Sequence, residues 1–200
     1  MISIKPKWVA KILNGKKTIE IRKNKALANA IQKLIDENGY ADIYVYCTKD
    51  NKTKLSSNSL QYYVVDNKDY KDYLGNWNGK VVFKFRCYKV EEVESRQYSI
   101  YQFPYTESLD SDDLLNKSCL LTKYFDDYLG YDKKGFAIHI SDLEIFDKPK
   151  ELNDFYRFGV DEWAKKHAGT KIGYVEFWNG IYDFRLTNAP QNYCYVEIGE

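Results

Sequence analysis

The sequence predicts an α+β fold in which strands outnumber helices and the helices surround them. Three observations lead to this prediction. Segments with alternating apolar side chains, rich in Tyr, Val, Ile and Phe, recur along the chain. A few other segments carry apolar residues at helical spacing. With 200 residues, 44% of them hydrophobic, the chain is long enough for one domain with a single sizeable core.

The first predicted elements are a strand and a short helix. Ile2 and Ile4 alternate with polar residues, as in a half-buried strand. Pro6 follows at a position where proline is tolerated, the first turn of a helix. Apolar residues then recur at helical spacing as far as Leu13, and Asn14-Gly15 supplies the left-handed conformation that ends a helix.

The second predicted strand carries charge on one face. Ile19 and Ile21 form an apolar face, whereas Thr18, Glu20 and Arg22 alternate with them on the other. A Glu and an Arg two residues apart are typical of a solvated strand surface, and they are equally compatible with a binding site. From this pattern alone, both interpretations stay open.

The remaining elements are predicted in chain order. Residues 26–36 are the clearest amphipathic helix, and Asn38-Gly39 closes it. The other expectations are a strand at 41–48, a polar loop at 51–59, a strand at 80–91, near-helical spacing at 111–129, a strand at 135–146, a turn at 152–155 leading into a helix at 160–167, and a strand at 192–198 that would close a barrel.

Charge is balanced overall but segregated locally. The chain contains 30 Lys and Arg residues and 29 Asp and Glu residues. This balance argues against a protein that coats nucleic acid non-specifically. A local basic patch is still predicted, because the first 25 residues hold a single acid, Glu20, and residues 107–113 are acidic. The basic residues of this N-terminal segment are Lys5, Lys7, Lys11, Lys16, Lys17, Arg22, Lys23 and Lys25.

Four separated cysteines, without a Cys-x-x-Cys pair or a His-x-x-x-His spacing, predict reduced thiols, and we expect no metal and no cofactor. No run of about 18 apolar residues occurs, and the first 20 residues lack the pattern of a signal peptide. We therefore expect a cytoplasmic protein without a membrane partner. The cysteines are Cys47, Cys87, Cys119 and Cys194.

Residues 1–22 resemble the opening of the ASCH family of PUA-like domains, whose signature is a strand, a helix, a Gly and a Lys-Thr-Ile-Glu-x-Arg-like strand, here Lys17 to Arg22. Five later segments are similar to those of ASCH proteins from phage and prophage genomes: 44–49, 79–85, 136–143, 148–152 and 189–196. The resemblance implies a mixed β-barrel with surrounding helices in a single domain, 1–200. Inserted segments are expected near 26–38, 50–75, 98–132 and 155–188.

The preferred function is binding of RNA, or of a nucleotide or modified base, in a basic cleft formed by the first strand, first helix and second strand. Lysines would neutralise phosphate, the arginine would bind a phosphate or base edge, the glutamate would orient it, and tyrosines would stack on bases. The expected site residues are Lys5, Lys7, Lys17, Thr18, Glu20, Arg22, Tyr46 and Tyr193.

A hydrolase is the first alternative. In ASCH amidohydrolases for acetylcytidine, which this chain resembles, Lys17 matches a catalytic Lys, but Glu20 occupies the place of the catalytic Thr, and a carboxylate cannot replace a hydroxyl nucleophile without a change of chemistry. In a ribonuclease, Lys17, Glu20 and His139 would act in catalysis, with Arg22 as a phosphate clamp. His139 is equally compatible with a structural, hydrogen-bonded role.

The second alternative is a phage-encoded interaction protein. Such a protein would bind a host protein or a nucleotide of a defence system, and its exposed aromatic side chains would then form an interface or a ligand pocket.

Overall fold

The computed structural model describes residues 1–49, 77–98, 101–130, 133–157, 171–172, 175–176 and 185–198. The loop predicted at 51–59 and the helix predicted at 160–167 lie outside the described residues. So does the expected insertion near 50–75, and those near 98–132 and 155–188 are described in part.

Two four-stranded sheets form the centre of the α+β fold. The first has the order β1 (Ile2–Ile4), β3 (Ala41–Cys47), β4 (Val81–Cys87) and β8 (Ser141–Lys150). The second has the order β2 (Ile19–Arg22), β7 (Gly135–His139), β5 (Val90–Tyr98) and β6 (Tyr101–Tyr105). The β1–β3 pair is parallel, and the other pairs in these two sheets are antiparallel.

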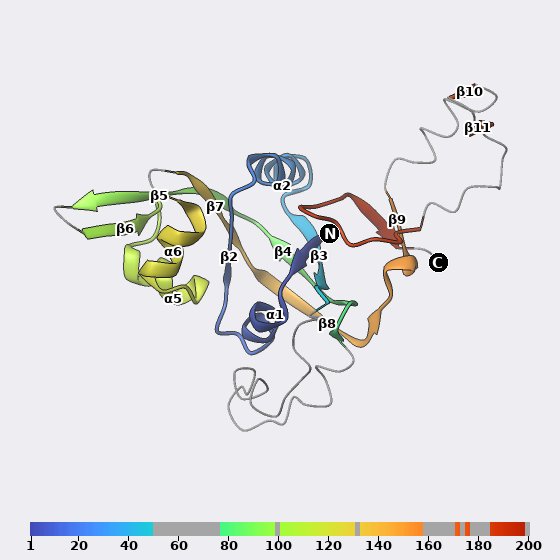
Figure 1. Cartoon of the computed structure of the whole chain (residues 1–200), viewed down its shortest axis with the longest axis horizontal. Helices are drawn as coiled ribbons and strands as arrows, with labels where there is room; N and C mark the ends of the chain where they lie inside the picture. Colours follow the sequence, from blue (N-terminus) through green and yellow to red (C-terminus); the bar gives the residue numbers. More distant parts are fainter. Residues whose placement is uncertain are drawn as a thin grey trace.

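The two sheets curl into a half-barrel because two chain segments run through both of them (Figure 1). β4 leads into β5 after two residues, and β7 leads into β8 after Ile140 alone. The sequence predicted one strand at 80–91 and one at 135–146, and each is divided at this bend. Asp142, with φ of 45°, and a register shift between Lys84 and Arg86 mark where the ladder is interrupted.

Helices α1 (Pro6–Leu13) and α2 (Lys25–Asn38) confirm the two helices that the sequence predicted. Pro6 stands in the first turn of α1. The Asn24 side chain caps α2 by accepting a hydrogen bond from the backbone N–H of Leu27, and Gly39, with φ of 82°, ends it in the left-handed conformation. Figure 1 shows α1 and α2 well apart, with β1 and β3 between them.

The largest core cluster lies between these two helices and the first sheet. Its buried side chains come from α1, from α2 and from the strands of the first sheet. Phe83 and Phe85 of β4 are completely inaccessible to solvent. The helices contribute one apolar stripe each: Val9 and Ile12 from α1, and Leu27 and Ile31 from α2.

A second core cluster joins the second sheet to helices α5 (Ser111–Ser118) and α6 (Thr122–Leu129). The near-helical pattern at 111–129 is therefore two helices. α5 ends at Cys119, which adopts the left-handed conformation with φ of 55°, a conformation that a continuous helix cannot contain. Leu114 and Leu129 pack from the helices onto Ile19, Ile21 and Val93 of the sheet.

The C-terminal part of the chain lies against the edge of β1. After η2 (Leu152–Asp154), β9 (Phe155–Arg157) pairs with β12 (Val196–Ile198), and a separate pair joins β10 (Lys171–Ile172) to β11 (Val175–Glu176). The strand predicted at 192–198 is thus shorter, and it joins β9 instead of closing a barrel with either four-stranded sheet. Tyr193 forms a single antiparallel bridge with Ile2.

Candidate functional site

The charged side chains around β2 form a buried ion chain of Lys17, Glu20 and Arg22. Lys17 and Glu20 are only 3% and 7% exposed. The Lys17 ammonium donates hydrogen bonds to the carbonyl oxygens of Ile19 and Ser118, at 2.7 and 2.8 Å, and lies 3.2 Å from Glu20 Oε2. Because an ammonium has three N–H donors, these contacts occupy all of them. The charged face of β2 is therefore not a solvated surface.

Arg22 continues this chain to the first sheet. Its Nε lies 2.9 Å from Glu20 Oε1, although the Nε–H makes no hydrogen bond to any residue that the structure describes. The Arg22 Nη2 donates a 2.7 Å hydrogen bond to the carbonyl oxygen of Ser3 in β1. Since β1 belongs to one sheet and β2 to the other, the guanidinium connects the two sheets where their ladders do not meet.

Burial disfavours the charged form of Lys17. Removal from water lowers the pKa of the Lys17 ammonium below its usual value of 10.5, and the charge and hydrogen bond of Glu20 offset this only in part. Lys17 is thus held in place by internal contacts rather than presented to solvent.

A lysine–indole face, made of Lys5, Lys7, Trp8 and Lys11, lies on the outer side of α1. Lys5 and Lys7 are exposed, and Trp8 and Lys11 are half-buried. The ammonium groups of Lys7 and Lys11 lie 4.5 and 5.3 Å from the centre of the Trp8 ring, and that of the buried Lys17 lies at 5.2 Å. Three cations therefore surround one aromatic ring.

The lysines of this face have no acidic partner within the described part of the chain. Among the described residues, no carboxylate lies within ion-pair distance of Lys5, Lys7 or Lys11. Lysines in the rest of the described chain commonly have such a partner, in the pairs Lys33–Glu37, Lys80–Glu151, Lys84–Glu144, Lys89–Glu91, Lys117–Asp113 and Lys134–Glu92. Lys148 and Lys150 of β8 also have no such partner among the described residues, so what distinguishes this face is the gathering of lysines around the Trp8 ring.

His139 belongs to a separate polar cluster. Its Nε2 lies 2.6 Å from Glu91 Oε1, and the Ser108 hydroxyl donates to the same carboxylate at 2.8–2.9 Å. Lys89 lies 3.3 Å from Glu91 Oε2. Burial alone would raise the pKa of the Glu91 carboxyl, but the hydrogen bonds from His139 and Ser108 and the charge of Lys89 lower it below its usual value of 4.5.

The strand register separates His139 from Glu20. Ile19 pairs with His139, and Glu20 pairs with Ile138, so that His139 and Glu20 project from opposite faces of the sheet. The three residues considered for catalysis are therefore not brought together: Lys17 and Glu20 are in contact, and His139 is engaged with Glu91 on the other side.

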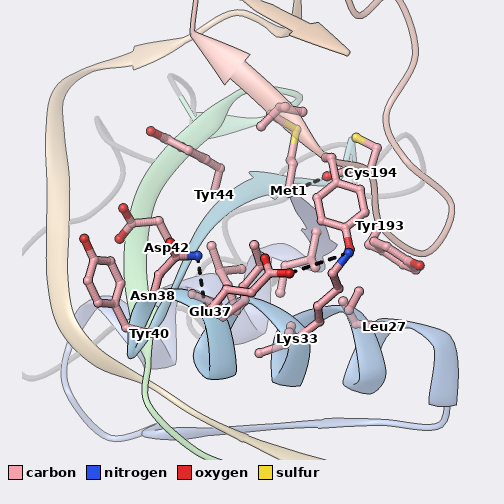
Figure 2. Close-up of a pocket in the computed structure, with 18 residues that line it drawn as sticks. Met1, Leu27, Lys33, Glu37, Asn38, Tyr40, Asp42, Tyr44, Tyr193 and Cys194 are labelled. Carbon is pink, nitrogen blue, oxygen red and sulfur yellow. Dashed lines mark hydrogen bonds and ion pairs between the residues drawn. The ribbon is translucent and has the colours of Figure 1, made fainter. Parts of the chain in front are cut away.

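The other predicted site residues lie in three places. Thr18 is exposed beside the buried ion chain. Tyr46 is 5% exposed and packs in a third core cluster with Met1 and Phe155, so its ring is covered. Tyr193 is half-buried and lines a pocket between α2, β3 and the C-terminal segment (Figure 2). Neither tyrosine is part of the lysine–indole face.

Sequence reasoning missed two partners. Glu91 was not singled out, although it shares a strand face with the fully buried Val93, and a carboxylate in that register signals a buried acid with polar partners. Ser118 carried no signal, because its contribution is a backbone carbonyl that approaches Lys17 from 101 residues away.

The described residues contain no group of three or more His, Cys, Asp or Glu side chains arranged to hold a metal ion. Their four cysteines are free thiols, and burial raises the pKa of Cys47 to about 12 and that of Cys87 to about 11. Within the same residues, no helix has the length and apolar character needed to cross a bilayer.

Comparison with known proteins adds no identification. Neither the models of known protein families nor the curated proteins give a match to this chain. The resemblance to the ASCH family therefore stays a prediction, and the function has to be argued from the geometry.

Proposed function

We propose that the protein binds RNA, or a nucleotide or modified base, through the lysine–indole face, as a PUA-like module of the ASCH type. One observation carries this proposal: Lys5, Lys7 and Lys11 lack a carboxylate partner among the described residues, and the ammonium groups of Lys7 and Lys11 lie against the indole of Trp8. Unpaired lysines favour phosphate, and an aromatic ring beside them favours the flat face of a base. The curled half-barrel is compatible with a PUA-like fold.

The buried ion chain has a supporting role in this proposal. Lys17 is engaged with Glu20 and with two backbone carbonyl oxygens, so phosphate contact falls to Lys5, Lys7 and Lys11. Lys17 also lies beneath the Trp8 ring system at 5.2 Å, and its charge adds to the positive potential there. Thr18 is exposed and Arg22 is half-buried, so both could add contacts to a bound ligand.

Fluorescence anisotropy tests this proposal with labelled single-stranded RNA, transfer RNA and duplex DNA at two salt concentrations. The Lys7→Ala, Lys11→Ala variant is compared with a Lys33→Ala, Lys134→Ala control, which also removes two charges but from paired lysines elsewhere. We expect the first variant to bind RNA more weakly and to reduce the slope of log affinity against log salt by about two, one for each lysine.

The control should keep the slope of the wild-type protein. Equal effects of the two double variants would mean that only net charge matters, and the proposed face would then be wrong. The absence of binding to all three nucleic acids would contradict a nucleic-acid module and direct the search to free nucleotides or to a partner protein.

A further inference from the structure

A pocket of about 730 Å³ lies at a place that the proposed function does not use. α2 forms one wall, residues 193–196 form the opposite wall, and β3 lies at the back (Figure 2). Figure 1 shows α2 well apart from α1, which carries the lysine–indole face. The volume falls within the roughly 300–1,000 Å³ of ordinary small-molecule sites.

The walls of this pocket are fixed by the fold. α2 is capped at its start by Asn24 and ended by Gly39. The facing wall is held by two hydrogen bonds between Met1 and Cys194, one from the Met1 amino group at 2.7 Å and one to the Met1 carbonyl at 3.1 Å, and by the bridge between Ile2 and Tyr193. The pocket is thus pre-formed, so ordering its walls adds little to the free energy of binding.

The deep part of the pocket is apolar. Ile2, Leu27, Ile31 and Ile43 line it and are 1–4% exposed, so an apolar ligand would extend the core cluster to which all four belong. Burial of apolar surface contributes about 25 cal/mol per Å², which makes such an interior a favourable place for an aliphatic or aromatic body.

The charged side chains that line the pocket are more acidic than basic, with Glu37 and Asp42 against Lys33. The side chains of Lys33 and Glu37 on α2 point toward one another (Figure 2). Lys33 Nζ lies 3.7 Å from Glu37 Oε1. Asp42 lies 3.4 Å from Arg86. The Met1 amino group is the remaining cation among the lining residues, and burial lowers its pKa to about 6, so that it is mostly uncharged at pH 7.

Polar groups without charge are present beside the apolar interior. Tyrosine side chains from β3, from the C-terminal segment and from the turn between α2 and β3 line the pocket, and a tyrosine hydroxyl can donate or accept a hydrogen bond. They are Tyr40, Tyr44, Tyr193 and Tyr195.

We propose that this pocket binds an uncharged amphipathic organic molecule, with its apolar body against α2 and β3 and its polar end among the tyrosine side chains. The chemistry differs from that of the lysine–indole face, which favours anions. The two sites are therefore separate, and neither proposal depends on the other.

Fluorescence titration tests the pocket with 1-aminoanthracene, an uncharged aromatic amine, and with 8-anilinonaphthalene-1-sulfonate, an anion of similar size. Ala30 lines the pocket and Ala26, one turn earlier on the same helix, is exposed to solvent. We expect saturable one-to-one binding of 1-aminoanthracene to the wild type and to Ala26→Trp. In Ala30→Trp, whose larger side chain stands at a lining position, binding should weaken at least tenfold, and the sulfonate should bind the wild type at least tenfold more weakly than the amine.

Thermal unfolding of each variant shows whether it is folded. If Ala30→Trp does not fold, Leu34→Phe adds a smaller volume from the next turn of α2 and should weaken binding in the same direction. Equal binding to Ala26→Trp and Ala30→Trp, or to wild type and Leu34→Phe, would overturn the site. Preferred binding of the sulfonate would overturn the ligand class. The Lys7→Ala, Lys11→Ala variant should bind 1-aminoanthracene normally, which separates this test from that of the proposed function.

Discussion

Lys17 and Glu20 form an ion pair almost fully removed from water, and the carbonyl oxygens of Ile19 and Ser118 complete the contacts of the ammonium. Such a pair is weak evidence for stability, because the removal of two charges from water offsets their attraction. The loss of one partner is strongly destabilising, since it leaves a buried charge without compensation.

We therefore expect Glu20→Gln to lower the free energy of unfolding at pH 7 by about 3 kcal/mol. Lys17→Met should also destabilise, because it removes the donors to two carbonyl oxygens. In the double variant the two losses should not add, with a coupling of roughly 0.5–3 kcal/mol. Urea denaturation of the four proteins measures this cycle, and strict additivity would mean that the pair is not coupled.

Glu91 should make stability depend on pH. Its pKa is below 4.5 in the folded protein, so the unfolded chain binds more protons as the pH falls, and the contribution of Glu91 to stability is lost. That contribution is present above pH 4.5 and disappears as the pH falls through the folded pKa. We expect the difference in unfolding free energy between wild type and Glu91→Gln to be largest near pH 7 and to shrink below pH 4.5. A difference that stays constant from pH 7 to pH 3.5 would contradict this assignment.

At the scale of elements, the sequence predicts a helix correctly where residues next to it in the chain determine its ends. α1 and α2 were predicted with their ends because Pro6, Asn14-Gly15 and Asn38-Gly39 act on their own neighbours in the sequence. The bends between β4 and β5 and between β7 and β8 were not predicted. The alternation of apolar and polar residues continues through both bends. The bends arise because each segment goes on to pair in the second sheet, to which distant strands contribute.

The candidate site was predictable to a similar extent. Alternation correctly placed Glu20 and Arg22 on one face of β2, and the segregated charge pointed to the N-terminal lysines. Burial of this face could not be predicted, because the groups that cover Lys17 include α5, about 100 residues later. The pocket gave no signal either, since α2 and residues 193–196 meet only in the folded chain.

At the scale of the whole molecule, two chain segments continue from one sheet into the other, whereas β1 and β2 each stand at one end of a strand order and do not pair with each other. The Arg22 guanidinium spans the gap between these strands through the carbonyl oxygen of Ser3. A hydrogen bond from a charged donor contributes roughly 1.5–3 kcal/mol. Arg22 is therefore placed to limit the opening of this seam.

Arg22→Gln should speed amide hydrogen exchange in β1 and β2 by about tenfold, which corresponds to roughly 1.4 kcal/mol of local opening. The amides of the β3–β4 ladder should not change. Arg86→Gln is the matched control, because Arg86 pairs with Asp42 on the surface of the first sheet, away from the seam. Equal protection of β1 and β2 in wild type and Arg22→Gln would show that the seam is held by other contacts.

The contacts between Met1 and Cys194 join residues that are 193 positions apart in the chain. A ribosome synthesises β1 well before residues 193 and 194, so the outer edge of β1 acquires these partners only after the intervening residues have been made. Contacts of such long range also carry a large entropy of loop closure and slow the folding of a domain. We therefore expect the pocket between α2 and residues 193–196, whose far wall depends on these contacts, to form late in folding.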